Sequence, residues 1–176
     1  MQHKIIFTGP VGAGKTTAIS SISDIPVAKT EAAASDEVVL RKANTTVAMD
    51  YGVLNLDGNK KMHLYGTPGQ ERFSFMWDIL TVGGVGLVLM IDNARKDPLA
   101  DVDFFIKHFK NFIQKNAVVI GVSRMDISPR PGLFTIKKHL KALNYNIPVF
   151  EVDARNKQDI KILLISLLAV LDPGIS

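Results

Sequence analysis

The segment that most constrains the fold is residues 9–16, Gly-Pro-Val-Gly-Ala-Gly-Lys-Thr, which spells G-x-x-x-x-G-K-[ST]. Glycines in this pattern let backbone N–H groups turn inward around phosphate oxygens, and the lysine reaches the β- and γ-phosphates. An apolar run at 4–8 precedes the pattern, and apolar residues at helical spacing follow it. A ligand-free turn between a strand and a helix is the alternative. The order of strand, loop and helix favours a nucleoside triphosphate site.

Composition limits what the rest of the chain can be. Its 176 residues suit one domain, 1–176, and the absence of cysteine excludes disulfides and thiolate chemistry. The net charge of +4 is mild, and Lys60-Lys61 and Lys137-Lys138 lack interleaved aromatic residues, so we expect no nucleic-acid binding. Neither a lipidation signal nor an apolar run long enough to span a bilayer is present. We therefore expect a cytoplasmic protein without a lipid anchor.

Strand-like and helix-like segments alternate along the chain. Two extended runs joined by the turn residues 57–59 predict a β-hairpin, whereas residues 24–45 show no periodicity and predict a long loop. Apolar runs and helical spacing predict further strands at 85–91, 117–122 and 147–152, and helices over 99–113, 136–143 and 160–171. The predicted fold is an α/β P-loop NTPase with a mostly parallel sheet of about six strands, one antiparallel edge strand and helices on both faces.

Two segments downstream carry residues suited to nucleotide chemistry. Gly69 can offer its N–H to a γ-phosphate, and the neighbouring Gln70 can orient an attacking water. Asp126 follows a predicted strand, where open α/β sheets bind ligands, and can accept from the N1–H and amine of guanine, while the backbone of Ala154 can meet O6. The alternatives are a loop glycine with a solvated amide and an aspartate that caps a turn.

Taken in order, these segments resemble the Ras-like small GTPases over nearly the whole chain. Thr46 and the run after it are similar to switch I, and residues 69–73 are similar to switch II. Residues 123–126, Ser-Arg-Met-Asp, stand where the family has Asn-Lys-x-Asp, and residues 153–155 stand where it has Ser-Ala-Lys. The runs 45–52 and 65–70 look most like a bacterial subgroup, the conservon-type ATP/GTP-binding proteins and MglA-like gliding-motility GTPases.

The resemblance implies Mg²⁺ as cofactor, GTP and GDP as ligands, and Roadblock-type activator or co-regulator proteins and effectors as partners at switch I and II. Mg²⁺ would bind Thr16 and Thr46, and Gln70 would position water. The residues expected at the phosphates are Gly9, Gly12, Ala13, Gly14, Lys15, Thr16, Thr17 and Gly69. The residues expected at the base are Ser123, Arg124, Asp126, Ala154 and Arg155.

Departures from the family pattern concern the metal and the base. Gly66 stands where the family has a metal-organising aspartate, which leaves Asp50 or Asp92 as the alternative carboxylate. Ser123 in place of asparagine is expected to lose the bond that ties the base loop to the phosphate loop. Arg124 can still stack on the base with its planar guanidinium. Guanine preference is then expected to depend mainly on Asp126.

Catalysis needs a positive charge beside the transferred phosphoryl group, and Lys15 supplies one. Arg41 is the first candidate for an arginine in the same role, and Arg72 is the second; each is otherwise a solvated or structural arginine. The apolar residues at 73–77 predict a partner surface that changes with the nucleotide. The sequence favours a slow GTPase switch. The alternatives are a nucleotide-binding interaction module with negligible hydrolysis and a P-loop ATPase.

Overall fold

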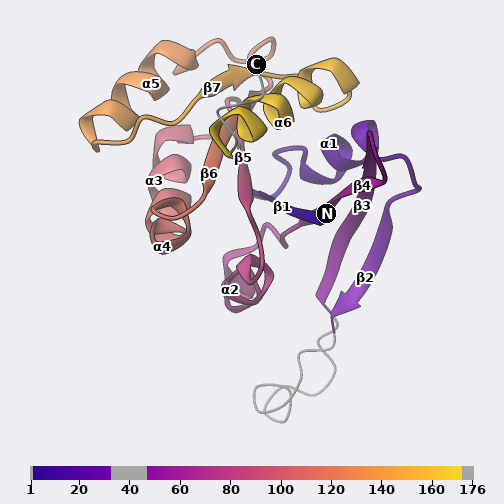
Figure 1. Cartoon of the computed structure of the whole chain (residues 1–176). Coiled ribbons are helices and arrows are strands. Elements are labelled where there is room, and N and C mark those ends of the chain that lie inside the picture. The colour runs from indigo at the N-terminus through magenta and orange to yellow at the C-terminus, as the bar shows by residue number, and fades with distance from the viewer. Residues whose placement is uncertain (1, 33–46, 172–176) are drawn as a thin grey trace.

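A computed structural model describes residues 2–32 and 47–171, which contain a mixed sheet of seven strands in the order β2-β3-β4-β1-β5-β6-β7 (Figure 1). The strands are β1 (Gln2–Thr8), β2 (Ala28–Ala32), β3 (Val47–Leu56), β4 (Lys60–Gly66), β5 (Gly86–Asp92), β6 (Ala117–Ser123) and β7 (Val149–Glu151). The helices are α1 (Lys15–Ile22), the 3₁₀ turn η2 (Glu71–Phe73), α2 (Ser74–Thr81), α3 (Pro98–His108), α4 (Lys110–Ile113), α5 (Gly132–Ala142) and α6 (Lys157–Leu171).

One strand, β3, runs against the others, which confirms the predicted mostly parallel sheet. It forms the expected hairpin with β4, in which Gly58 and Asn59 have positive φ angles of 70° and 60°. The edge position belongs to β2, which pairs with β3 and lies inside the segment 24–45 that was expected to be a loop. This part of the prediction was wrong because Ala-Lys-Thr-Glu-Ala has no apolar face; backbone pairing alone marks it as a strand.

Helices cover both faces of the central strands. Alternate residues of β1 point to opposite faces: Ile5 packs with α1 and α6, whereas Ile6 packs with α2, α3 and α5. Every residue of β5 and β6 is buried, as their continuous apolar runs predicted. Figure 1 shows α3 and α4 on one side of these strands and α1 on the other. The predicted layers of helix, sheet and helix are confirmed.

The remaining predicted helices differ from the structure only in detail. The pattern expected over 99–113 divides at Phe109 into α3 and α4, and Asp97 caps α3 by accepting from the backbone N–H of Ala100 at 3.0 Å. Within the described residues, no helix is long and apolar enough to cross a membrane. The parallel strands β1, β5, β6 and β7 end at the same edge of the sheet, so the loops after them meet there.

Candidate functional site

The loop between β1 and α1 has the backbone that its glycines predicted. Gly9 has a φ of 141°, and a Cβ added to it would lie 2.1 Å from the carbonyl oxygen of Met90. Gly14 has a φ of 96° and ends the loop as the N-cap of α1, where an added Cβ would lie 2.8 Å from that of Ala154. Only glycine fits these positions, and the loop can therefore turn its N–H groups inward at the start of a helix.

Lys15, the first residue of α1, closes this loop. Its Nζ donates to the carbonyl oxygens of Gly9 and Pro10, at 2.8 Å each, and the residue is 8% exposed. Burial lowers the pKa of Lys15 to about 8, although the nearby Asp50 carboxylate acts in the opposite direction. An ammonium group buried among carbonyl dipoles lacks a full counter-charge, which the anionic oxygens of a phosphate chain can supply.

Thr16 and Asp50 form the part of the site that suits a metal ion. The Thr16 hydroxyl donates to Oδ2 of Asp50, which lies opposite Gly66 in the β3–β4 pair. A Cβ added at Gly66 would lie 3.1 Å from Asp50 Cβ and 3.2 Å from its Oδ2, so the Asp50 side chain fills the space beside the glycine. A hydroxyl and a carboxylate at the phosphate loop are oxygen donors of the kind that Mg²⁺ takes together with phosphates and waters. These residues fit the metal that the sequence implied.

Asp92, the other carboxylate considered for the metal, has a different function in the structure. Its side chain is only 4% exposed, and its Oδ2 accepts from Nη1 of Arg124 at 2.8 Å. Its Oδ1 accepts from the backbone N–H of Ala94 at 2.9 Å. Asp92 therefore holds the guanidinium of Arg124, which the sequence had assigned only to stacking on the base. No sequence pattern indicates this ion pair, because Asp92 ends β5 and Arg124 follows β6, and only the folded sheet brings the two residues together.

Ser123 corrects one expectation. The replacement of asparagine by serine was expected to remove the bond between the base loop and the phosphate loop. In the structure the Ser123 hydroxyl lies 3.2 Å from the carbonyl oxygen of Ala13 and 3.3 Å from that of Ile91, and it can donate to either. The residue is 5% exposed, and β6 ends close enough to the phosphate loop for a short side chain to reach it. The two loops remain connected.

A cleft of about 720 Å³ opens where the loops meet. Gly12, Ala13, Gly14 and Thr17 line its phosphate-loop side, and Arg124 and Asp126 line the side that follows β6. The third side follows β7 and includes Glu151, Asp153, Ala154 and Arg155. All five residues predicted at the base, Ser123 included, therefore border one cavity that also touches the phosphate loop.

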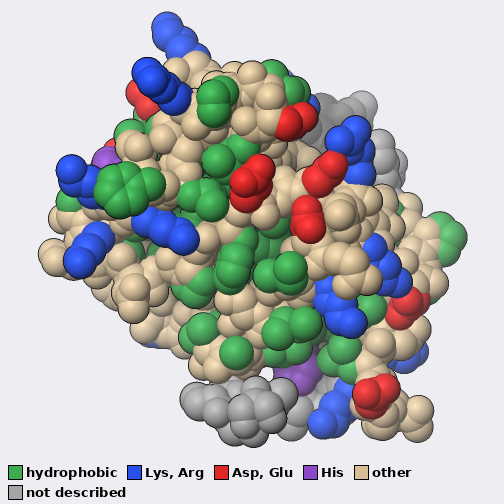
Figure 2. Space-filling model, turned by 90° about the horizontal axis from the view of Figure 1, so that it is seen from above, with side chains coloured by type: hydrophobic (Ala, Val, Ile, Leu, Met, Phe, Trp, Pro, Cys, Tyr) green, Lys and Arg blue, Asp and Glu red, His purple; other side chains and the backbone are tan. Residues whose placement is uncertain are grey.

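The charges around the cleft form local pairs. Asp126 is exposed, and its charge raises the pKa of Arg155 after the larger effects of Asp153. Arg155 bonds to Asp153 through its backbone N–H, Nε and Nη2 at 2.7–2.9 Å, and these bonds lower the pKa of Asp153 to about 2. Figure 2 shows acidic side chains close together near the middle of the face seen from above. Asp126 remains available to accept hydrogen bonds from a base.

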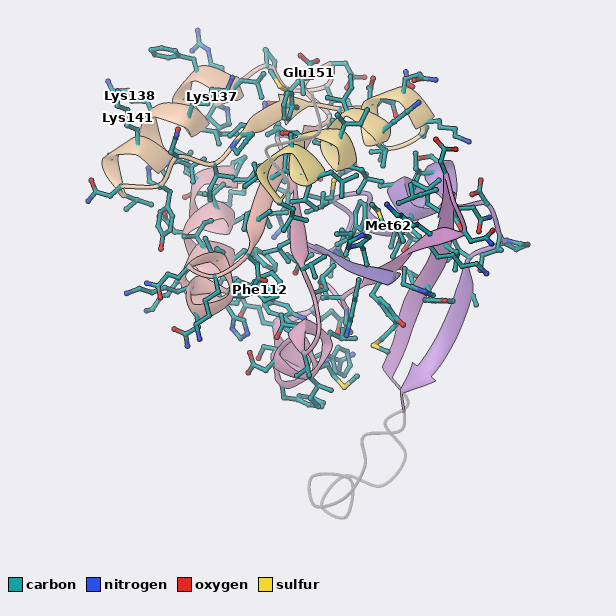
Figure 3. All side chains as sticks on the ribbon, in the orientation of Figure 1. Met62, Phe112, Lys137, Lys138, Lys141 and Glu151 are labelled. Carbon is teal, nitrogen blue, oxygen red and sulfur yellow. The ribbon has the colours of Figure 1, made fainter. Side chains whose placement is uncertain are left out.

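The lysines of α5 stand apart from this cleft. Figure 3 shows Glu151 at the end of β7, whereas Lys137, Lys138 and Lys141 project from α5 toward the other side of the molecule. Lys137 and Lys138 are exposed.

The segment after β4 lies directly on the phosphate loop. A Cβ added at Gly69 would lie 2.7 Å from the backbone nitrogen of Val11 and 2.8 Å from Nζ of Lys15. Gln70, the next residue, is exposed and precedes the 3₁₀ turn η2. The structure thus brings Gly69 to the loop that the sequence predicted to bind the γ-phosphate, and it places Gln70 beside it.

A hydrogen bond that the sequence did not indicate holds this segment. Nε1 of Trp77, in α2, donates to the carbonyl oxygen of Pro68 at 2.8 Å, and Trp77 is fully buried. Its ring stacks on Phe105 and Phe109 of the α3 region, with centroids 5.0 and 5.6 Å away. The residue before Gly69 is therefore joined to the core through one side chain.

Two predicted site residues, Arg41 and Thr46, lie outside the described residues. Arg72, the second candidate for a catalytic arginine, lies in η2 with its guanidinium 4.7 Å from the centre of the Phe73 ring. That cation–π contact favours a local, structural role for Arg72.

Comparison with known proteins supports a nucleotide-binding fold. The chain is 24% identical over 170 residues to the Ras-related protein RABE1e of Arabidopsis thaliana, across 93% of this chain and 72% of that protein. It is 26% identical over 162 residues to the GTP-binding nuclear protein GSP1 of Encephalitozoon cuniculi, across 88% of this chain and 69% of that protein. These distant similarities to small GTPases extend over most of the chain.

An uncharacterized protein of Methanocaldococcus jannaschii is 33% identical over 106 residues, which span 60% of this chain and 60% of that protein's length. A family model described as conserved hypothetical ATP binding protein matches residues 26–164, which is most of the chain, although the matched part begins after the phosphate loop. The GTP-binding nuclear protein and the family model both name nucleotide binding, and they differ in the base that they name. The chain belongs to the family of conserved hypothetical ATP binding proteins.

Proposed function

We propose that this protein is a guanine-nucleotide switch that binds GTP with Mg²⁺ and hydrolyses it slowly to GDP. The observation that carries the proposal is the contact of Gly69 with Val11 and Lys15, at the sheet edge where Asp126 and Ala154 border the cleft. The phosphate loop and the base loops thus border one ligand-sized space, and the loop able to sense a γ-phosphate contacts the phosphate loop. A switch needs these parts to act on one nucleotide.

The exposed carboxylate of Asp126 favours guanine. Guanine presents an N1–H and an exocyclic amine side by side, and a carboxylate can accept from both. Adenine presents an acceptor at N1, which would face the Asp126 oxygens without a proton between them. The backbone N–H at Ala154, which also borders the cleft, can donate to O6 of guanine and would meet an amine in adenine.

In the proposed hydrolysis, the oxygen of a water forms a bond to the γ-phosphorus, and the bond from that phosphorus to the β–γ bridging oxygen breaks. GDP and inorganic phosphate leave; one proton of the water passes to solvent, and the other stays on the phosphate. Gln70 orients the water, the Gly69 N–H binds a γ-phosphate oxygen, and Lys15 stabilises the charge on the leaving side. When bound, Mg²⁺ neutralises charge on the β- and γ-phosphates, and Thr16 and Asp50 would hold it.

The outer surface of α2 supports a partner-binding role. Phe75, Ile79 and the following Val82 are 41%, 60% and 74% exposed, directly after the Gly69 segment. Apolar side chains in this position would change their surroundings when the segment moves with the nucleotide. We propose Roadblock-type activators or co-regulators, and effectors, as the proteins that bind there.

One observation favours a second candidate, an ATPase, because the matching family is described as ATP binding. Affinities for GTP and ATP, measured on nucleotide-free protein by calorimetry, separate the two. We expect GTP to bind at least about 100-fold more tightly, the value of two charge-assisted hydrogen bonds. Equal affinities would contradict the assignment of the base.

Single-turnover hydrolysis tests the enzymatic part. We expect slow cleavage of GTP that a Roadblock-type partner accelerates and that Gln70→Leu removes, with GDP affinity unchanged, since Gln70 is exposed and packs in no core cluster. GTP binding without cleavage, with and without the partner, would instead indicate a nucleotide-binding interaction module.

A further inference from the structure

Arg95 lies beside the phosphate loop, although no motif includes it. It belongs to the connection between β5 and α3, two residues before the α3 cap. Its Nη1 lies 3.5 Å from the carbonyl oxygen of Val11, a distance at the outer limit of hydrogen bonding. The guanidinium therefore borders the loop without a strong bond to it, and the side chain is 40% exposed.

Asp101, in the first turn of α3, holds this guanidinium. Nε of Arg95 donates to Oδ2 of Asp101 at 2.7 Å, and Nη2 lies 3.5 Å from Oδ1. Nη1 remains directed toward the phosphate loop. A planar guanidinium held at one edge keeps donors on its other edge and has already lost part of its rotational freedom.

Arg95 and Lys15 reach the same loop. Nζ of Lys15 donates to the carbonyl oxygens of Gly9 and Pro10, and Nη1 of Arg95 lies 3.5 Å from that of Val11, the next residue. Two cationic side chains beside one short loop repel each other unless an anion lies between them. The γ-phosphate of a nucleoside triphosphate is the anion that this loop is built to hold.

We propose that Arg95 is an additional γ-phosphate ligand, supplied in cis by the β5–α3 connection. The inference rests on the proposed function and adds an arginine that sequence motifs did not indicate. Its guanidinium donates from the free edge to a γ-phosphate oxygen while Asp101 holds the other edge or releases it. Because a nucleoside diphosphate lacks that phosphate, Arg95 distinguishes the triphosphate from the diphosphate.

The candidate arginines differ in what they contact. Arg72 stacks on Phe73 within its own turn, and Arg41 lies outside the described residues. Arg95 is the arginine whose guanidinium lies within 3.5 Å of the phosphate loop in the described part of the chain. A partner-independent role in binding the triphosphate follows from this placement.

The test compares Arg95→Ala with Lys96→Ala, which removes the same charge from the next, exposed residue. Dissociation constants for GTP and GDP are measured on the full chain with Mg²⁺. We expect Arg95→Ala to weaken GTP binding by about tenfold and GDP binding by less than about twofold, which is the loss of one charge-assisted hydrogen bond. Lys96→Ala is expected to change neither.

The variant Asp101→Asn tests whether Arg95 binds phosphate or only supports the structure. If Arg95 binds phosphate, removal of the competing carboxylate charge leaves GTP affinity equal to or above that of the wild type. If the ion pair only supports α3, Asp101→Asn and Arg95→Ala weaken GTP and GDP binding alike, and the proposal is wrong. If the wild-type protein binds GTP and Arg95→Ala binds it equally well, the role of Arg95 is wrong while the proposed function stands. Wild-type protein that binds no GTP would overturn the proposed function as well.

Discussion

The hydroxyl of Thr16 donates to the carboxylate of Asp50, which reaches the phosphate loop from the strand β3. Asp50 lies opposite Gly66, the position that carries an aspartate in the family that the sequence resembles. A carboxylate on either of these paired residues would point to the same region, since residues directly opposite each other in a sheet share a face. The antiparallel pairing thus lets β3 provide the acid that β4 lacks.

We expect Asp50→Asn to weaken Mg²⁺-dependent nucleotide binding by about 10- to 100-fold, the usual effect of losing a carboxylate that orients a metal ligand. The amide keeps the size of the side chain and the bond from the Thr16 hydroxyl, but it loses the negative charge. Titration of Mg²⁺ into the nucleotide complex, followed by nucleotide release, measures this effect.

The matched control moves the carboxylate from position 50 to position 66, which lies opposite it in the β3–β4 pair. Gly66→Asp alone should crowd the Asp50 side chain, since its Cβ would lie 3.1 Å from that of Asp50. The double variant Asp50→Gly with Gly66→Asp removes this crowding and should recover part of the Mg²⁺ dependence. Equal Mg²⁺ affinity in Asp50→Asn and wild type would show that the carboxylate does not serve the metal.

Much of the fold could be predicted from local sequence, because the central strands are buried on both faces and their apolar runs are continuous. The phosphate loop could be predicted for a similar reason: its glycines have backbone angles that other residues avoid. The edge strand β2 could not be predicted, because it is held by backbone hydrogen bonds and its five residues carry no apolar pattern.

The site was predictable residue by residue but not contact by contact. Asp126, Gly69 and Lys15 follow from motifs with fixed spacing, whereas the Ser123 bond to Ala13 depends on a distance between two loops. The pairing of Arg124 with Asp92 and the position of Arg95 depend on neighbouring strands that are far apart in sequence. Such contacts leave no periodic signal, because only the folded sheet brings them together.

Asp126→Asn should change the preferred base rather than abolish binding. The amide oxygen can still accept from N1–H, but the amide N–H₂ faces the exocyclic amine of guanine, where no acceptor exists. Xanthine carries a carbonyl oxygen at that position. We expect GTP affinity to fall by about 2 kcal/mol, roughly 30-fold, and XTP to bind more tightly than GTP. Competition between labelled GTP and XTP measures the relative affinity for the two nucleotides.

A variant that fails to fold would bind neither nucleotide. A gain in XTP affinity therefore shows that the Asp126→Asn protein is folded and that its base preference has changed. The control is Asp153→Asn, a neighbouring carboxylate that bonds to Arg155. It should leave the order of GTP and XTP unchanged. Unaltered GTP and XTP affinities in Asp126→Asn would remove Asp126 from the base site.

Trp77→Phe should loosen the Gly69 segment from the core. Phenylalanine keeps the aromatic packing on Phe105 but leaves the Pro68 carbonyl without the donor that Nε1 provides. We expect the free energy of unfolding to fall by about 1–2 kcal/mol and GTP cleavage to slow, with GDP affinity unchanged. Urea unfolding and single-turnover hydrolysis measure the two effects.

Phe109→Leu provides the comparison for that variant. Phe109 packs on the Trp77 ring and is 3% exposed, so its replacement also lowers stability while the Pro68 bond remains. A similar loss of stability with normal cleavage would assign the catalytic effect of Trp77→Phe to the hydrogen bond. Equal slowing of cleavage in both variants would assign it to general destabilisation.

Nucleotide affinity should decrease as the pH rises above about 8, because burial lowers the pKa of Lys15 to about 8 in the empty site. Phosphate binds the charged ammonium, so the complex keeps its proton to higher pH than the free protein does. Below pH 8 Lys15 is already charged and affinity is full; at pH 9 about one molecule in ten carries the proton, which lowers affinity about tenfold. Calorimetry in two buffers of different ionisation enthalpy should therefore find almost no proton uptake on GDP binding at pH 7 and about one proton at pH 9. GDP tests this without the titration of a γ-phosphate, and equal proton uptake at both pH values would place the pKa of Lys15 outside this range.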